Sequence, residues 1–194
     1  MNLVERVKKL ILQPKQEWQA IDGETHTVQG LYTQYVMILA AIPAVCGFIG
    51  LSLIGIGVFG ATYRVPIASG VAHMVVQYLM SLGMVYLMAL IIDALAPNFG
   101  SQKNFGQAFK VAAFFPTAAW LAGVFSIIPS LGIIGTLLAL YSLYLLFVGL
   151  PILMKTPEDK TIPYVVVVII AAIVIAVVIV ALIGLTMPGP VRGF

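Results

Sequence analysis

The sequence predicts an all-α membrane protein with five transmembrane helices and an amphipathic, interfacial helix at its N-terminus. Of its 194 residues, 61% are hydrophobic and 9% are charged, whereas soluble domains have roughly 45–50% apolar and about 25% charged residues. With so few charged side chains, a water-soluble fold would leave large apolar patches exposed. Five apolar stretches also reach the roughly 20 residues that a helix needs to cross the hydrocarbon of a bilayer.

The first 30 residues are expected to form a cytoplasmic segment that does not cross the membrane. Apolar residues recur near its start at the spacing of one helix face: Leu3, Val4, Val7, Leu10 and Ile11. Charged residues fill the other face: Glu5, Arg6, Lys8 and Lys9. A short basic amphipathic helix favours a position in the membrane interface; packing against the protein's own loops is the alternative. Pro14 ends this helix, and the Trp18 indole that follows suits the level of the lipid headgroups.

The transmembrane domain is predicted over residues 31–187, followed by a short external tail at 188–194. Its five apolar stretches cover residues 31–53, 66–96, 109–128, 131–154 and 163–187. Val and Ile, which favour strands, dominate the last stretch, but its uncharged run is longer than an ordinary strand. Helices are predicted throughout, because a helix satisfies its own backbone hydrogen bonds in lipid. Pro43 and Pro116 each remove one of these bonds, so kinks are expected in the first and third helices.

The distribution of Lys and Arg between the short connections predicts the orientation of the chain. One side of the predicted bundle collects most of these cations: Arg6, Lys8, Lys9, Lys15, Lys103, Lys110, Lys155 and Lys160. The other side holds only Arg64 and Arg192. Because cytoplasmic loops carry the excess of positive charge, the N-terminus is expected in the cytoplasm and the C-terminus outside.

Polar residues within the apolar stretches are the main candidates for a functional site, because ionisable groups at membrane depth are costly. A stripe on the second helix contains polar residues at intervals of four: Ser69, His73, Gln77 and Ser81. We expect this stripe to face the interior of the bundle, either as a polar pathway for a small ligand or as a set of interhelical hydrogen bonds. Asp93 and Lys110, near the same membrane surface, are expected to form an ion pair.

The sequence contains no combination of residues typical of a catalytic, metal or cofactor site. Its only cysteine is Cys46 and its only histidines are His26 and His73, too few for a His/Cys metal site. Residues 55–60 match the pattern G-x-G-x-x-G, but neither the preceding strand nor the later acidic residue of a dinucleotide site is present. We therefore expect a protein that is not an enzyme and has no cofactor. The formal net charge of +3 is spread over separate loops, so nucleic acid is not an expected partner.

Proline, glycine and aromatic residues recur in short groups along nearly the whole chain. The groups are Pro14 with Trp18 and Ile21; Phe48 to Gly50 with Ile54 and Gly55; Phe115 with Pro116; Ile128 with Pro129 and Gly132; Tyr141, Tyr144 and Gly149; and Lys155, Pro157, Lys160 and Tyr164. Together with the amphipathic start and the five apolar stretches, these groups resemble the YIP1 family, in particular its small bacterial inner-membrane branch. The resemblance implies an inner-membrane protein. The eukaryotic members are associated with vesicle trafficking and small GTPases, partners that a bacterial cell does not supply.

The expected function is that of a membrane adaptor or scaffold that binds lipids or partner proteins through its cytoplasmic face. Candidate residues for this surface are Arg6, Lys8, Lys9, Trp18, Lys155 and Lys160. The lipid bilayer is the expected partner, with anionic lipids and other membrane proteins as further candidates, and oligomerisation stays open. The alternative function is that of a small transporter or channel subunit that uses the polar stripe of the second helix.

Overall fold

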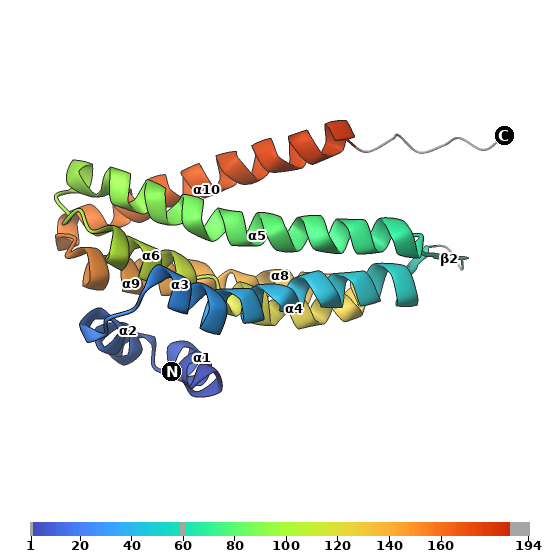
Figure 1. Cartoon of the computed structure of the whole chain (residues 1–194), viewed down its shortest axis with the longest axis horizontal. Helices are drawn as coiled ribbons and strands as arrows, with labels where there is room; N and C mark the ends of the chain where they lie inside the picture. The colour runs from blue at the N-terminus through green and yellow to red at the C-terminus, as the bar shows by residue number, and fades with distance from the viewer. Residues whose placement is uncertain (1, 59–60, 187–194) are drawn as a thin grey trace.

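The computed structural model describes residues 2–58 and 61–186, which form an elongated bundle of long helices (Figure 1). Two short helices lie beside one end of the bundle, and a small β hairpin lies at the opposite end. The predicted tail at residues 188–194 lies outside the described residues. Within the described chain the protein is almost entirely helical, as its composition and apolar stretches predict.

The two short helices are α1 (Leu3–Leu12) and α2 (Pro14–Gly23). The Asn2 side chain caps α1 by accepting a hydrogen bond from the backbone N–H of Glu5 at 3.3 Å, which satisfies one of the free donors at a helix start. Proline suits the first position of α2, where no backbone N–H is needed. The chain therefore ends one helix and starts the next within two residues of Pro14.

The first long helical segment runs from Val28 to Ile54 and leads into the β hairpin. It consists of α3 (Val28–Leu31), the wide turn η1 (Tyr32–Val36), α4 (Met37–Phe48) and the wide turn η2 (Ile49–Ile54). The antiparallel hairpin consists of β1 (Ile56–Val58) and β2 (Ala61–Tyr63). Gly55 makes the transition with a φ of 89°, a conformation that suits glycine. This hairpin is not predicted from the sequence pattern.

The remaining long segments follow in sequence order and are interrupted at prolines and glycines. They comprise α5 (Ile67–Leu95) with the 3₁₀ turn η3 (Ala96–Phe99); α6 (Phe105–Phe114), α7 (Thr117–Ala122) and the turn η4 (Gly123–Ile127); the turn η5 (Pro129–Leu131) with α8 (Gly132–Ala139) and α9 (Tyr141–Met154); and α10 (Glu158–Thr186). The third segment starts one turn earlier than predicted, because Asn104 caps it by accepting a hydrogen bond from the N–H of Gln107 at 3.2 Å.

The two predicted kinks differ in outcome. At Pro116 the third segment divides into α6 and α7. The Thr117 hydroxyl there donates to the carbonyl of Phe114 at 2.5 Å and is hydrogen-bonded to the Tyr35 hydroxyl at 2.7 Å, so a carbonyl at the break is satisfied. Pro43, in contrast, remains inside the continuous helix α4.

Four helical segments of the described chain are long and apolar enough to cross a membrane. They are Val28–Ile54, Ile67–Phe99, Phe105–Ile127 and Gly132–Met154, and they coincide with the first four predicted stretches. The fifth predicted stretch corresponds to α10, a helix of 29 residues that packs along α5 and α9. Of the most apolar part of the third segment, 67% is buried, against 28% for each of the first two segments. The third segment therefore forms the centre of the bundle.

Candidate functional site

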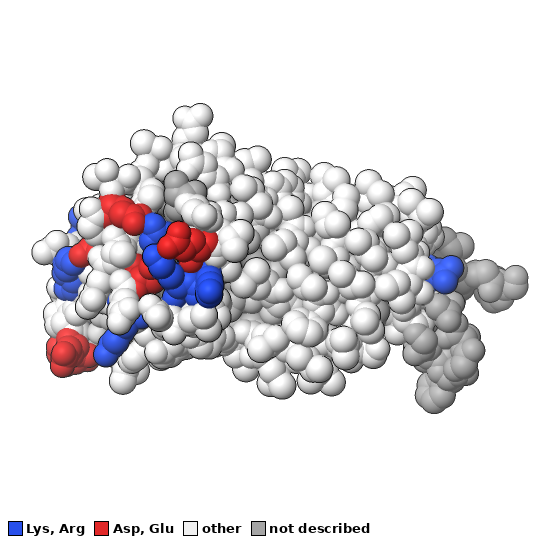
Figure 2. Space-filling view, turned by 90° about the horizontal axis from the view of Figure 1, so that it is seen from below, with Lys and Arg blue, Asp and Glu red and all other residues white. Residues whose placement is uncertain are grey.

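Nearly all charged side chains of the described chain gather at one end of the bundle, which we call the charged end (Figure 2). It comprises α1, α2, the connection between α5 and α6, the first turns of α6, and the connection between α9 and α10. Arg64, between β2 and α5, belongs to the opposite end. The strong asymmetry of charge that the sequence predicts is therefore present in the folded protein.

Helix α2 docks on the bundle through two apolar side chains, Trp18 and Ile21, both of which are completely buried. The Trp18 ring meets the Phe114 ring edge to face, with 6.2 Å between centroids. It also covers Gly149 of α9, where any side chain would collide with the indole. Trp18 was predicted to belong to a lipid- or partner-binding surface, and this prediction is wrong because the indole is part of the core.

Arg6 joins α1 to α2 and to the segment that follows α2. Its guanidinium donates to Glu17 at 2.7 Å and to Glu24 at 2.6 Å, and it also lies over the Phe114 ring at 5.9 Å. The side chains of Arg6 and Glu17 are only 10% and 9% exposed. Arg6 was also predicted to lie on the binding surface. Instead it serves as an internal cross-link, because a buried guanidinium needs hydrogen-bonded carboxylates.

Glu24 connects this cluster to His26, whose Nε2 lies 2.7 Å from the second carboxylate oxygen. Burial by itself would raise the pKa of Glu24, but the hydrogen bonds from Arg6 and His26 outweigh it and lower that pKa below its ordinary value of 4.5. The carboxylate is therefore held in its charged form, and the three side chains hold the start of the first long segment against α1.

Lys110 lies on α6 and is buried, but its partner is the end of α2 instead of Asp93. Its ammonium donates to the carbonyls of Ile21 at 3.0 Å and of Glu24 at 2.5 Å. These carbonyls lie at the negative end of the helix dipole, where a cation is stabilising, and the Ile21 carbonyl also accepts from the backbone N–H of Glu24 at 3.3 Å. The predicted ion pair between Asp93 and Lys110 is therefore not formed. The Oδ1 atom of Asp93 is buried and has no hydrogen-bond partner among the described residues.

Asp22 provides two further attachments for α2. Its carboxylate accepts hydrogen bonds from Lys155 at 2.5 Å and from the Gln107 amide at 3.0 Å. Lys155 thus contributes to the internal structure as well as to the surface, since its side chain is 47% exposed. The sequence pattern does not reveal Glu17, Asp22, Glu24 and Gln107 as hydrogen-bond partners at the charged end. The available signal was Lys110 itself, because a lysine in an apolar run requires polar groups around it.

The outward side of α1 combines exposed apolar and basic side chains. Val4 is 74% exposed and Leu12 is 66% exposed, and Lys8 lies between them on the same helix face. Lys15, in the first turn of α2, is exposed as well. We call Val4, Lys8, Leu12 and Lys15 the basic apolar surface. The sequence pattern groups Val4 with the apolar face of an interfacial helix. The other residues of that face pack against the protein core, namely Leu3, Val7, Leu10 and Ile11, whereas Val4 points outward.

The other predicted surface lysines have weaker contacts. Lys9 pairs with Glu5 at 2.8 Å one turn away on the surface of α1. The hydrogen bond between them lowers the pKa of Glu5 and raises the pKa of Lys9. Lys160 is exposed and lies 3.9 Å from Asp159. These side chains remain accessible at the charged end.

The predicted polar stripe of α5 does not face the bundle interior. Ser69, His73 and Gln77 are all exposed on the outside of α5. Only Ser81 is half-buried; it donates to the carbonyl of Tyr78 at 2.7 Å and borders a small cavity of about 160 Å³. The four residues therefore share a helix stripe but do not form one site. Within residues 2–58 and 61–186, no three His, Cys, Asp or Glu side chains are grouped so that they could hold a metal ion.

Comparison with known proteins agrees with this architecture. A family model described as the Yip1 domain matches residues 8–180. The inner membrane protein YohC of Escherichia coli K12 is 28% identical over 159 residues, which cover 80% of this chain and 82% of YohC. YohC of Escherichia coli O6:H1 is similar to the same extent. No solved structure matches the chain. Because the domain model covers most of the sequence, this protein belongs to the YIP1 family of integral membrane proteins.

Proposed function

We propose that this protein is a non-enzymatic adaptor or scaffold of the bacterial inner membrane, which binds lipids or partner proteins through its charged end. In this proposal α10 is the fifth transmembrane helix, and the charged end faces the cytoplasm. The excess of Lys and Arg at that end supports the orientation. The name of the similar inner membrane protein YohC supports the location.

The observation that carries the proposal is the basic apolar surface of α1 and α2. Val4 and Leu12 are large apolar side chains that remain exposed, with Lys8 between them. An amphipathic helix with this combination binds the membrane interface through buried apolar area and attraction to anionic headgroups. Because Arg6 and Trp18 fix α1 and α2 to the bundle, the surface is held at one position beside the transmembrane helices (Figure 1).

The alternative function, transport along the stripe of α5, has less support. A polar pathway needs its side chains to border a water-filled space inside the protein. His73 and Gln77 are exposed on the outer surface of α5. Their position gives no reason to prefer transport over the adaptor function.

Fluorescence quenching tests whether the basic apolar surface lies in the interface. A fluorophore is attached at Leu12→Cys in a Cys46→Ser background, and the full protein is reconstituted in bilayers with lipids that carry quenchers near the headgroup. We expect strong quenching at residue 12. The matched control is Glu158→Cys, an exposed position at the start of α10, where we expect little quenching. Equal quenching at both positions would contradict the interfacial role.

Thiol labelling in intact cells tests the orientation. A reagent that does not cross membranes should modify Arg64→Cys in the intact inner membrane and Lys103→Cys only after the membrane is opened. Both positions are exposed, so a difference in labelling reports the side of the membrane and not burial. The opposite pattern would reverse the proposed orientation.

A further inference from the structure

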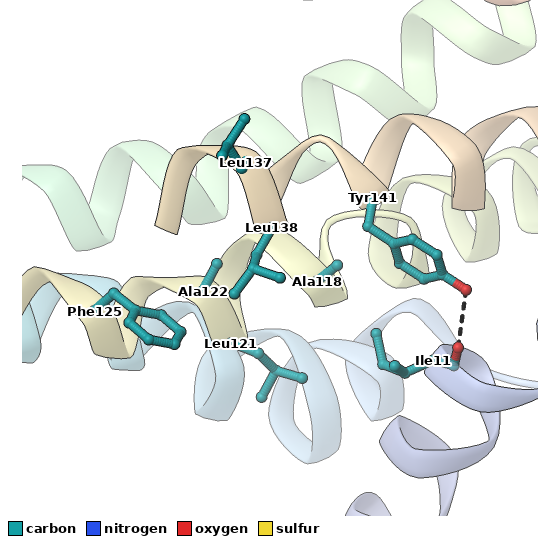
Figure 3. A pocket seen from close by; sticks show the side chains of 8 residues that line it. All are labelled: Ile11, Ala118, Leu121, Ala122, Phe125, Leu137, Leu138 and Tyr141. Atoms are coloured by element: carbon teal, nitrogen blue, oxygen red, sulfur yellow. Dashed lines mark hydrogen bonds between the residues drawn. The ribbon is translucent and has the colours of Figure 1, made fainter. Parts of the chain in front are cut away.

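An apolar groove opens on the side of the bundle where α1 meets α7, α8 and α9 (Figure 3). Its volume is about 530 Å³, which lies within the range of about 300–1,000 Å³ that is typical of ligand sites. The side chains that bound it include Ile11, Ala118, Ala122, Phe125, Leu138 and Tyr141. The groove is separate from the ion pairs of the charged end and from the polar stripe of α5.

The walls and the position of the groove define the chemistry of its occupant. Nearly all of its wall is apolar, and apart from Ile11 its residues belong to the segments Phe105–Ile127 and Gly132–Met154, which are suited to cross a membrane. Ile11 and Tyr141 lie at one end of the groove and Phe125 lies at the other (Figure 3). In a bilayer, the apolar molecule available to such a groove along its full length is the acyl chain of a lipid.

Helix α1 is fixed at the end of the groove nearest the charged end. The Tyr141 hydroxyl donates a hydrogen bond to the backbone carbonyl of Ile11 at 2.9 Å, and Figure 3 shows this bond beside the groove. The carbonyl belongs to the last turn of α1, where it has no partner within the helix. The bond therefore holds the cations of α1 and the start of α2 close to the end of the groove.

Two exposed cations near this end suit the headgroup of the same lipid. Lys8 precedes Ile11 by one turn of α1, and Lys15 follows in the first turn of α2. Neither lysine has an ion-pair partner among the described residues. Each Lys near a membrane surface contributes attraction to anionic lipids. The charge of these side chains therefore selects an anionic headgroup over a zwitterionic one.

We propose that this groove binds one acyl chain of an anionic phospholipid whose headgroup lies beside Lys8 and Lys15. This inference rests on the proposed function and deepens it by naming the lipid class and the site. The lipid fills the space between α1 and the transmembrane helices and attaches the basic apolar surface to the bilayer.

Photocrosslinking maps the acyl chain directly. The full protein is placed in nanodiscs that contain phosphatidylglycerol or phosphatidylcholine with a photoreactive group on one acyl chain, both at the same mole fraction, and labelled peptides are identified by mass spectrometry. We expect phosphatidylglycerol to label residues 117–141 more than the outer face of α5 at residues 67–80. Equal labelling of the two regions would identify only ordinary boundary lipid and would overturn the proposal.

Filling the groove provides the specific test. Ala122→Leu and Ala122→Phe place side-chain atoms in the groove, and both should reduce labelling of residues 117–141 by phosphatidylglycerol. The leucine variant is the milder change if phenylalanine disturbs folding. The control is Ala72→Phe, on the exposed outer face of α5, which should leave labelling of the groove unchanged. Unchanged labelling in a folded Ala122 variant would overturn the proposal.

Removal of the cations tests the headgroup. Lys8→Gln and Lys15→Gln should each reduce the preference for phosphatidylglycerol over phosphatidylcholine about fivefold, the ratio that corresponds to about 1 kcal/mol. Lys103→Gln, an exposed position in the connection between η3 and α6, is the control and should have no effect.

Two results of the photocrosslinking experiment would overturn the lipid site without affecting the proposed function. One is equal labelling by the two lipids in the wild-type protein. The other is protection of the groove from both probes, which a protein helix seated in it would cause. In either case, quenching at Leu12→Cys would still report whether α1 lies in the interface.

Discussion

Helices α6 and α8 are both apolar, but their surroundings are opposite. Every residue of α6 from Ala108 to Phe114 is buried, so this part of the helix is enclosed by protein on all sides. No residue of α8 is buried, and Ile133 and Leu137 are 75% and 63% exposed. In water such a helix would be unstable, whereas in lipid its exposed side chains lose nothing. The two helices show that an apolar sequence in this protein does not imply a buried position.

The membrane position that we propose for each helix accounts for this difference. In that proposal water reaches the charged end, so apolar rings such as Trp18 must be enclosed and polar groups such as Lys110 must be paired. Lipid would surround α8, where no such requirement acts. The fold is therefore specified mainly at the charged end, and we expect substitutions there to be more disruptive.

Trp18→Ala should have the largest effect. Removing a large side chain from a packed core costs about 3–5 kcal/mol, and Trp18 is completely buried against Phe114 and Gly149. Amide hydrogen exchange across residues 14–23 in nanodiscs should accelerate at least about a hundredfold. The matched variant Leu137→Ala on α8 should leave its own peptide unchanged. Similar responses at both sites would remove the contrast between the two regions.

Arg6→Met should have the next largest effect. It leaves the Glu17 carboxylate buried without its cation, which costs about 2–3 kcal/mol, and hydrogen exchange in α1 and α2 measures the loss. The double variant Arg6→Met with Glu17→Leu removes both charges and should restore most of the protection. A double variant as unstable as the single one would mean that packing of the Arg6 side chain matters more than its charge.

Lowering the pH should loosen the charged end selectively. The pKa of Glu24 lies below its unfolded value of 4.5, so its contribution to stability is complete above about pH 4.5 and is lost as the pH falls through the lower, folded pKa. Relative to the intrinsic amide exchange rate, which itself slows as the pH falls, we expect exchange in α1 and α2 to accelerate below pH 4.5 while α8 keeps its protection. In Glu24→Gln this acceleration should become smaller. Parallel acceleration in α8 would instead indicate global unfolding.

Glu5→Gln should have the smallest effect. The pair of Glu5 and Lys9 is 57% and 50% exposed, and exposed pairs of this kind contribute little because water and salt screen them. Exchange in α1 should be the same in Glu5→Gln and in the wild-type protein at moderate salt. Strong loosening of α1 would show that charge matters there even without burial.

The sequence predicted the helical segments well, because length and apolarity are the properties that lipid requires of a helix. It could not predict which face of a segment meets protein. On α5 the spacing places Ser69, His73 and Gln77 on one stripe. Apolar residues occur on both the lipid side and the protein side of such a helix, so the periodicity could not predict which way this stripe faces. The β hairpin was missed for a different reason, since its strands have only three residues each.

The errors at the charged end arise from long-range contacts. Arg6 is charged, and Trp18 is a residue type that is common at the membrane interface. Arg6 is internal only because it pairs with Glu17 and Glu24, and Trp18 only because α2 packs on α6 and α9. The prediction for Lys110 was wrong because its acceptors are backbone carbonyls at the end of α2. One of them belongs to Ile21, which lies 89 residues earlier in the chain. A pattern of side chains cannot reveal such a contact.

The carbonyl acceptors of Lys110 also determine how freely the turn around Ile21 and Glu24 can vary. Side-chain replacement deletes no main-chain oxygen, so this anchor survives any mutation there that preserves the local backbone path. The side chains on the outside of the turn can therefore change during evolution while the hydrogen bonds from Lys110 of α6 persist. Loss of the single ammonium group, in contrast, would remove all of the Lys110 hydrogen bonds to this turn at once.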